Sequence, residues 1–97
     1  MTEDDVRAAL REVLDPELGV NIVDLGLVYG IEVEGDVARV TMTMTTPACP
    51  LRDYLQDLVE SEVLLRVGDA RRVDVAIVTE PPWSEERMSD AARAQLG

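Results

Sequence analysis

Apolar side chains recur every three or four positions near the start of the chain, at Val6, Leu10, Val13 and Leu14. This is the spacing of the buried face of an amphipathic helix. Thr2 is a suitable N-cap, and the acidic residues that follow it favour the positive end of the helix dipole. Pro16 disfavours helical backbone at the residue before it. The pattern therefore predicts a helix over residues 2–14.

A period of two follows, which is the spacing of strands with one buried face. It extends over residues 25–34 and 36–43. A tight turn at Gly35 joins these two segments, so they are expected to form an antiparallel hairpin. The alternation returns over residues 72–78 and predicts a third strand.

Helical spacing returns in two later segments. The first covers residues 50–67, where Pro50 suits the first helical position because its missing N–H has no helical partner. The second covers residues 85–96, with the serine before it as N-cap. Trp83 and Met88 have the spacing of a hydrophobic staple around that cap.

The order of these elements, αββαβα, indicates the fold class. A helix between the second and third strands makes them parallel through a right-handed crossover, whereas the hairpin is antiparallel. We expect an α/β (α+β) fold of two layers with a three-stranded mixed sheet. Residues 1–97 are expected to form one domain, because a chain of this length usually holds one. The pattern leaves open whether the third strand lies beside the first or the second.

Composition excludes several classes of function. The 97 residues include 20 acidic and 9 basic side chains, for a formal net charge of -11, and a polyanion lacks the basic surface that binds nucleic acid. No apolar run approaches the roughly 18 residues that span a membrane, and the acidic N-terminus does not resemble a signal peptide. Histidine is absent and Cys49 is the single cysteine, which excludes a disulfide or dithiol within the chain. A free thiol in a small domain favours the cytoplasm.

Cys49 is the most informative single residue. It precedes Pro50 at the predicted N-cap of the second helix, where the helix amides and dipole favour a thiolate, and Arg52 in the first turn adds positive charge. The alternative is a small apolar residue that happens to occupy a cap. Because Ser, Thr or Asp would cap the helix better, helix stability does not explain a cysteine here.

Two groups of polar residues are candidates for the same site. Thr46 and the threonine before it can donate hydrogen bonds to a sulfur ligand or an anion, or can simply belong to a strand end and turn. Asp15, Glu17 and Asp24, with an asparagine between the last two, can bind a metal or shape a pocket beside the cysteine. Asp-Pro is equally a common signal for the end of a helix and a turn, so both interpretations stay open.

Gly26 and Gly30 lie four positions apart around the start of the first strand. In so short a segment this spacing is not a membrane-helix motif. It indicates close packing of the backbone or a β-bulge.

Three motifs, in order, resemble one family over nearly the whole chain. They are DPELGVNIVDLGLVY at residues 15–29, TPACP at residues 46–50, and a C-terminal segment that begins with Pro82-Trp83-Ser84. Together they resemble a small iron–sulfur cluster assembly domain, shared by SufT-like and PaaD-like bacterial proteins and by a subunit of the eukaryotic cytosolic iron–sulfur targeting complex. The cysteine of the second motif is that family's proposed functional residue, and the αββαβα order agrees with the family's fold.

The resemblance implies an accessory factor that assembles iron–sulfur clusters or delivers them to apo-proteins; whether the chain is also an enzyme stays open. Carried across residue by residue, the functional positions are Cys49 and Thr46 in the second motif, and Asp15, Glu17 and Asp24 in the first. One cysteine cannot hold a cluster. The implied cofactor is therefore a transient cluster or iron ion that is not firmly bound. Its remaining ligands come from an iron–sulfur assembly protein, an apo-protein client or a second copy in a homodimer.

Three alternatives accompany this hypothesis. The first is a PaaD-like maturation component for a phenylacetyl-coenzyme A oxygenase. PaaD-like members often carry a further cysteine-rich C-terminal region, which this sequence does not show, so the SufT-like type is favoured. The second is a non-catalytic adaptor that recruits partners through its acidic surface and C-terminal segment. The third is an enzyme with Cys49 as nucleophile, whose base would have to be Asp or Glu because histidine is absent.

Overall fold

Helices and a three-stranded sheet form two layers in a computed structural model, which describes residues 1–45 and 51–96. In order along the chain, the elements are α1 (Glu3–Leu10), β1 (Val28–Glu34), β2 (Val37–Met42), α2 (Arg52–Arg66), β3 (Arg72–Ile77), the 3-10 turn η1 (Glu85–Arg87) and α3 (Asp90–Leu96). The predicted αββαβα order and the α+β class are confirmed.

β2 is the central strand of the sheet, whose order is β1-β2-β3. It pairs antiparallel with β1 through the hairpin and parallel with β3 through the α2 crossover. The predicted mixed sheet is confirmed, and the third strand lies beside the second. The register of the hairpin shifts between Val28 and Gly30, which fits a bulge, one of the two explanations given for the spacing of Gly26 and Gly30.

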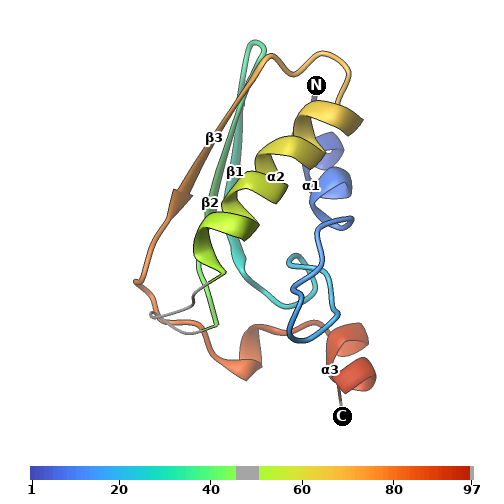
Figure 1. Ribbon diagram of the computed structural model, residues 1–97, viewed down its shortest axis with the longest axis vertical. Helices are drawn as coiled ribbons and strands as arrows, with labels where there is room; N and C mark the ends of the chain where they lie inside the picture. Colours follow the sequence, from blue (N-terminus) through green and yellow to red (C-terminus); the bar gives the residue numbers. More distant parts are fainter. Residues whose placement is uncertain (46–50, 97) are drawn as a thin grey trace.

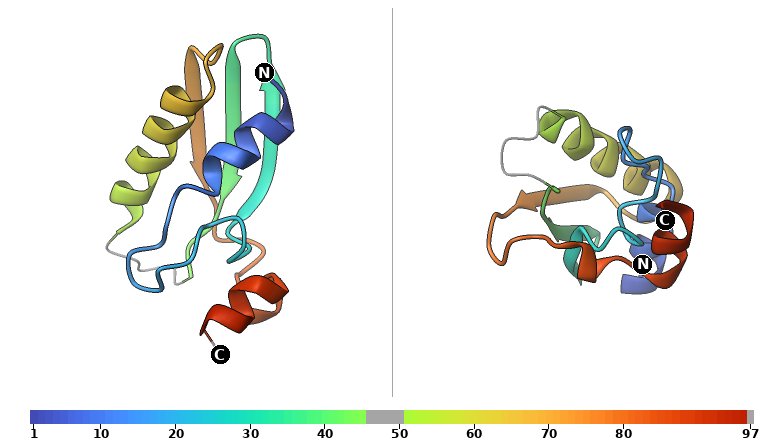
Figure 2. Two further views of the ribbon diagram at one scale, coloured as in Figure 1. Left: turned by 90° about the vertical axis from the view of Figure 1, so that its right-hand side faces the viewer. Right: turned by 90° about the horizontal axis from the view of Figure 1, so that it is seen from below.

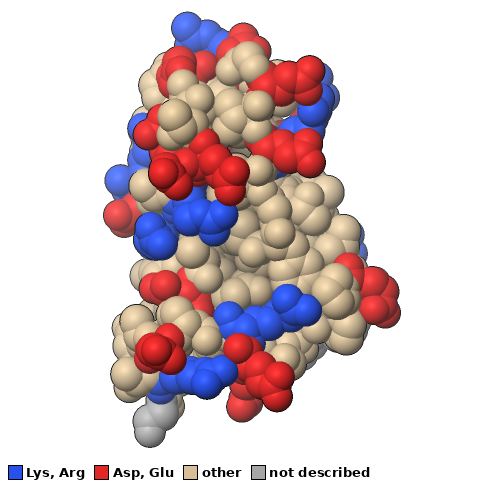
Figure 3. Space-filling view, turned by 180° about the vertical axis from the view of Figure 1, so that it is seen from behind, with Lys and Arg blue, Asp and Glu red and all other residues tan. Residues whose placement is uncertain are grey.

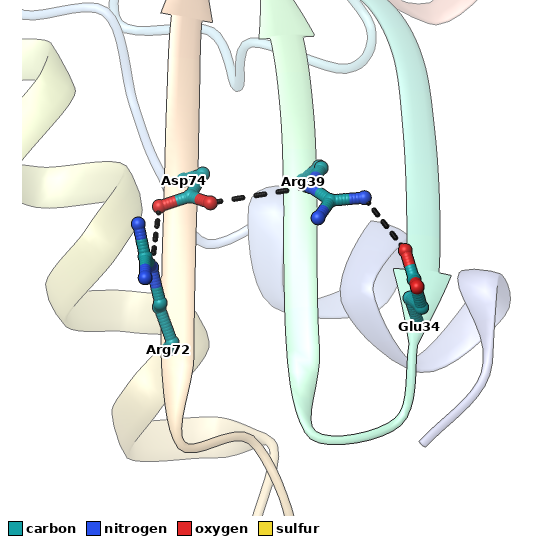
Figure 4. Close-up of polar contacts among 4 residues, drawn as sticks. All are labelled: Glu34, Arg39, Arg72 and Asp74. Carbon is teal, nitrogen blue, oxygen red and sulfur yellow. Dashed lines mark hydrogen bonds and ion pairs between the residues drawn. The ribbon is translucent and has the colours of Figure 1, made fainter.

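α1 and α2 cover one face of the sheet (Figures 1 and 2). Their apolar faces pack with the inward side chains of the strands and of the loop before β1. The largest fully buried side chains of this core are Leu10, Ile22, Leu25, Leu27, Met42 and Leu55. The opposite face of the sheet carries charged side chains, among them Glu34, Arg39, Arg72 and Asp74 (Figure 4). The sheet therefore separates an apolar layer from a polar surface, as one-sided strands require.

Charged side chains of both signs are interspersed on the surface seen from behind (Figure 3). They form an upper and a lower group, which uncharged surface separates. The net negative charge is thus not gathered into one acidic patch on this face. Among the helices that the structure describes, none is long and apolar enough to cross a membrane.

α1 ends at Leu10, four residues earlier than predicted. The cause is a competing set of backbone hydrogen bonds with the loop that follows. Ile22 N donates to Val13 O at 3.0 Å, and Asp15 N donates to Val20 O at 3.0 Å. The chain after α1 therefore pairs with its own loop instead of continuing the helix.

α2 begins at Arg52, with Leu51 at its N-cap position and no side-chain hydrogen bond to the first turn. The prediction that Cys49 is the cap residue is therefore wrong. Cys49 itself lies outside the described residues. A leucine side chain has no oxygen to accept from the first N–H groups of a helix, so the residue at the N-cap position does not cap α2.

The helix predicted over residues 85–96 is divided into η1 and α3. Ser89 lies at the break: its Oγ accepts from Ala92 N at 3.1 Å, which caps α3, and its own N–H donates to Asp24 O at 2.7 Å. The backbone bond to the loop before β1 draws the chain out of the helical path. Trp83 and Met88 therefore do not staple one continuous helix; both pack, partly buried, against the core.

Gly26 lies where the loop before β1 meets the C-terminal segment. Its φ is +78°, a conformation that favours glycine, and a Cβ at this position would lie 2.3 Å from Arg87 O. This close approach of two backbones confirms the tight packing expected at this glycine. The loop and the C-terminal segment can therefore meet only if this residue has no side chain.

We expect Gly26→Ala to lower the free energy of unfolding by at least ~3 kcal/mol. The left-handed backbone costs an alanine about 1–2 kcal/mol, and displacement of the Arg87 backbone adds to that cost. Gly19→Ala is the matched control, because φ is +70° there but nothing lies within 4 Å of the added Cβ, so only the backbone cost of about 1–2 kcal/mol applies. Urea unfolding measures both variants. Equal losses would contradict the close-approach explanation.

Candidate functional site

A small cavity of about 60 Å³ opens where β2 and β3 end and α2 begins. Residues from four segments line it: Thr43, Met44, Thr45, Arg52, Ile77, Val78, Thr79, Pro82 and Trp83. Three threonines and a guanidinium thus meet apolar walls. The carboxyl ends of parallel strands are the usual place for ligands in α/β sheets, so we take this cavity as the candidate site and call it the strand-end pocket.

Thr43 links the three strands by hydrogen bonds at the base of the strand-end pocket. Its side chain is buried, and its Oγ1 donates to Val78 O at 2.7 Å. Its backbone N–H donates to Leu27 O at 2.8 Å, while Val78 N donates to Met42 O at 2.9 Å. These bonds extend the pairing of all three strands by one residue beyond the regular sheet. The pocket therefore stands on hydrogen-bonded backbone.

Trp83 supplies one wall of the pocket and is positioned from a distant part of the sequence. Its indole Nε1–H donates to Leu25 O at 2.7 Å, across 58 residues of chain. Nearby, the hydroxyl of Tyr29 donates to Pro81 O at 2.7 Å, and the guanidinium carbon of Arg87 lies 4.7 Å from the centre of the Tyr29 ring. These contacts bind the C-terminal segment to the loop before β1 and to the start of that strand.

The acidic residues Asp15 and Asp24 are engaged within their own loop. Asp15 is buried, and its Oδ1 accepts from Glu17 N at 2.8 Å and from Leu18 N at 3.2 Å. Asp24 Oδ2 accepts from Asn21 Nδ2 at 2.7 Å, and Asp24 N donates to Asn21 Oδ1 at 2.9 Å. Asx turns of this kind fix loop conformation, so both carboxylates stabilise the loop that presents Leu25 O to Trp83.

Glu17 is exposed, and neither it nor the two aspartates line the strand-end pocket. Within residues 1–45 and 51–96, no three His, Cys, Asp or Glu side chains are grouped so that they could hold a metal ion. The roles of Asp15, Glu17 and Asp24 in binding stay predictions.

Cys49 and Thr46 lie outside the described residues. The described chain nevertheless locates the ends of their segment, because Thr45 on one side and Arg52 on the other both line the strand-end pocket. The sequence pattern identified Thr45, Thr46 and Arg52 as neighbours of the cysteine. It did not assign a site role to Thr43 or to Thr79.

Sequence reasoning also missed Trp83 as a pocket residue, because the local pattern matched a staple. One signal was present: a crossover that makes two strands parallel places their carboxyl ends side by side. That signal could have indicated the threonines at both strand ends, although not the tryptophan.

A family model described as iron-sulfur cluster assembly protein matches residues 3–77. The chain belongs to this family. A family relative, the Fe-S protein maturation auxiliary factor SufT of Staphylococcus aureus, is 42% identical over 88% of this chain and 97% of that protein. A crystal structure of a domain of unknown function from Bacillus anthracis is 43% identical, with a TM-score of 0.94 over 98% of this chain and 91% of that one. The resemblance carried by the three motifs is thus confirmed.

The iron-sulfur cluster assembly family also includes longer proteins. An iron-sulfur cluster carrier protein from Synechocystis is 35% identical over 84% of this chain, but the match covers 23% of the carrier. The same kind of domain therefore forms most of one relative and a minor part of another.

We expect Trp83→Phe to lower the free energy of unfolding by about 2 kcal/mol, because the buried Leu25 carbonyl loses its donor. Tyr29→Phe is the matched control: it also removes one hydrogen bond to a carbonyl of this region, but that bond is exposed, so water replaces it and the loss stays below about 0.5 kcal/mol. Urea unfolding followed by circular dichroism measures both. A loss for Trp83→Phe no larger than that of the control would contradict the anchoring role of the indole N–H.

Proposed function

We propose that this chain is an accessory factor that assembles iron–sulfur clusters or delivers them to apo-proteins, with the Cys49 thiolate as its working group. One structural observation supports this role for Cys49: residues on both sides of its segment, Thr45 and Arg52, line the strand-end pocket. Family membership and the relatives named as Fe-S protein maturation auxiliary factor and iron-sulfur cluster carrier support the function itself.

Covalent geometry supports the link between Cys49 and the strand-end pocket. Three peptide units separate Cys49 from Arg52, and consecutive Cα atoms lie about 3.8 Å apart, so the two Cα atoms are at most about 11 Å apart. A nearby guanidinium favours a thiolate over a thiol. The hydroxyls of Thr45 and Thr79 can donate hydrogen bonds to sulfur at the same place. In this proposal Thr46 adds a further donor.

The cluster is the cargo of this reaction, and its ligands must come from more than one chain. A cluster is usually held by four protein ligands, mostly cysteine thiolates, whereas the whole chain has one cysteine and no histidine. Cys49 therefore shares the cluster with an assembly protein, an apo-protein client or a second copy of the chain. Such sharing suits a carrier, because a cluster with incomplete ligation passes readily to a client with better ligands.

The acidic residues of the first motif contribute differently in this proposal. Asp15 and Asp24 hold the loop whose Leu25 carbonyl anchors Trp83, so they position the wall of the strand-end pocket. The exposed carboxylate of Glu17 is available to a partner protein. The proposed setting is the cytoplasm, where a free thiol stays reduced.

Anaerobic reconstitution with iron and sulfide tests the thiolate role. We expect Cys49→Ser to lower the iron bound per chain about tenfold and to lower cluster transfer to an apo-ferredoxin by a similar factor, because serine is a poor ligand for iron–sulfur clusters. Visible absorption and iron counting give the first quantity, and recovery of ferredoxin absorption gives the second.

The matched control moves the thiol instead of removing it. Ser61 is exposed on α2, away from the strand-end pocket, so Cys49→Ser combined with Ser61→Cys keeps one thiol per chain. We expect this variant to behave like Cys49→Ser alone. Recovery of iron binding by the relocated thiol, or full transfer activity of Cys49→Ser, would overturn the role of Cys49. If Cys49→Ser still captures apo-protein clients and supports their maturation, the chain is an adaptor.

A further inference from the structure

The outer edge of β3 carries no paired strand in the part of the chain that the structure describes. β3 is the last strand of the sheet, and its ladder runs to β2 alone. An unpaired edge strand presents a row of free N–H and C=O groups, which other strands can join. This edge is therefore a candidate surface for association.

The hydrogen bonds to β2 show which backbone groups of β3 point outward. Arg72 N donates to Asp36 O at 3.3 Å, and Val78 N donates to Met42 O at 2.9 Å. In a parallel ladder alternate residues face the neighbouring strand, so the backbone groups of Val73, Val75 and Ile77 face away from β2. Gln56 Nε2 approaches Val75 O from α2 at 3.5 Å, which is at the limit of a hydrogen bond. The outward carbonyl of Val75 is thus engaged only weakly within the chain.

A groove of about 450 Å³ follows this edge. Gln56, Glu60 and Leu64 of α2 form one side, and residues 71–75 form the other. Leu64, on the helix side of this groove, is 40% exposed. The groove therefore offers both backbone groups and an apolar side chain to an incoming segment.

The charged residues of β3 indicate that a second copy of the same strand fits against this edge. Arg72 and Asp74 project from the helix-free face, and Arg72 Nε lies 2.9 Å from Asp74 Oδ1. They end a row of alternating charges across the sheet, in which Arg39 lies between Glu34 and Asp74 (Figure 4). If a second β3 lies antiparallel to the first with Val73 opposite Val73, each Arg72 faces the other chain's Asp74. The strand is self-complementary in this register, because opposite charges in directly facing positions stabilise a strand pair.

The other edge of the sheet lacks this property. The outward face of β1 carries Glu32 and Glu34, so an antiparallel pair of β1 strands would set like charges near each other. The register shift between Val28 and Gly30 interrupts this strand as well, and bulges discourage edge pairing. Of the two edge strands, β3 is therefore the one suited to pair with a second copy of itself.

We propose that two copies of this chain associate through β3, antiparallel about Val73, to form one continuous six-stranded sheet. The facing Arg72–Asp74 pairs set the register, and the outward backbone groups of the two Val73 residues supply the hydrogen bonds at the centre of the pair. The arrangement does not rest on the proposed iron–sulfur function. The strand-end pockets begin at Ile77, four residues from the centre of the pair, so at about 3.3 Å per residue they lie roughly 25 Å apart at opposite ends. Each pocket stays open to a different partner.

Charge reversal tests this pairing by sedimentation equilibrium in metal-free, reducing buffer. Arg72→Asp and Asp74→Arg each place like charges opposite each other twice, so we expect each to raise the dimer dissociation constant about tenfold. An equimolar mixture of the two variants restores both facing pairs in a heterodimer, as the double variant Arg72→Asp/Asp74→Arg does in a homodimer. In both cases the dimer dissociation constant should return to within about threefold of that of the unmodified chain. Both positions are on the surface, and circular dichroism verifies that each variant is folded.

A cross-linking measurement tests the register separately. In a Cys49→Ser background, Arg72→Cys of one chain faces Asp74→Cys of another, so the oxidised mixture should give a disulfide-linked dimer in higher yield than either variant alone. A monomeric unmodified chain at about 1 mM, reversals that leave the dissociation constant unchanged, or equal yields from like cysteines would each overturn the proposal. Because no step involves iron, these outcomes are independent of the role of Cys49.

Discussion

The parallel pairing of β2 with β3 is the constraint on which the rest of the structure depends. A parallel pair requires a crossover, which α2 supplies here by packing over the sheet. The crossover brings both carboxyl ends and the start of α2 to one end of the sheet. Thr43 joins the strands there, since its Oγ1 donates to Val78 O. The strand-end pocket is thus a product of topology. The same topology leaves β3 as an edge with nowhere to pair inside the described chain.

The C-terminal segment completes the pocket that the crossover begins. The family model ends at residue 77, whereas Pro82 and Trp83, which line the pocket, lie beyond it. The loop before β1 holds this segment through backbone groups: Leu25 O accepts from Trp83, and Asp24 O accepts from Ser89 N. The first and third motifs therefore meet through carbonyl oxygens, and Asp15 and Asp24 hydrogen-bond within the loop that carries those carbonyls.

The regular elements could be predicted because the core imposes their periods. Alternation in the two hairpin strands and helical spacing in α1 and α2 both reflect one buried face, so their existence and order followed from the pattern. Element ends were less predictable. α1 ends early because Asp15 N donates to Val20 O instead of to Arg11 O, a bond formed only once the loop has folded back. The break before α3 likewise depends on a bond from Ser89 to Asp24, 65 residues away in sequence.

The residues of the candidate site also divide into those that could be predicted from the sequence and those that could not. The residues beside Cys49 could be identified from sequence, because Thr45 and Arg52 are its neighbours along the chain. Trp83 could not, because its role depends on Leu25, and nothing near either residue indicates the contact. The acidic cluster was ambiguous for a physical reason: Asp-Pro and Asn-x-x-Asp suit both a metal and an Asx turn. Only the hydrogen bonds of Asp15 and Asp24 show that each carboxylate is engaged in its loop.

Because this chain has few candidate ligands, most ligands of a shared cluster would have to come from another chain. Asp15 and Asp24 are engaged by donors of their own loop, and histidine is absent. A dimer joined through β3 does not supply the missing thiolates, because it sets the two pockets at opposite ends of one sheet. In that arrangement each copy meets a separate partner, and the further ligands come from that partner's own cysteines. On the two proposals together, such a dimer would present two equivalent sites, and the partners that provide the remaining ligands would determine where the cluster goes.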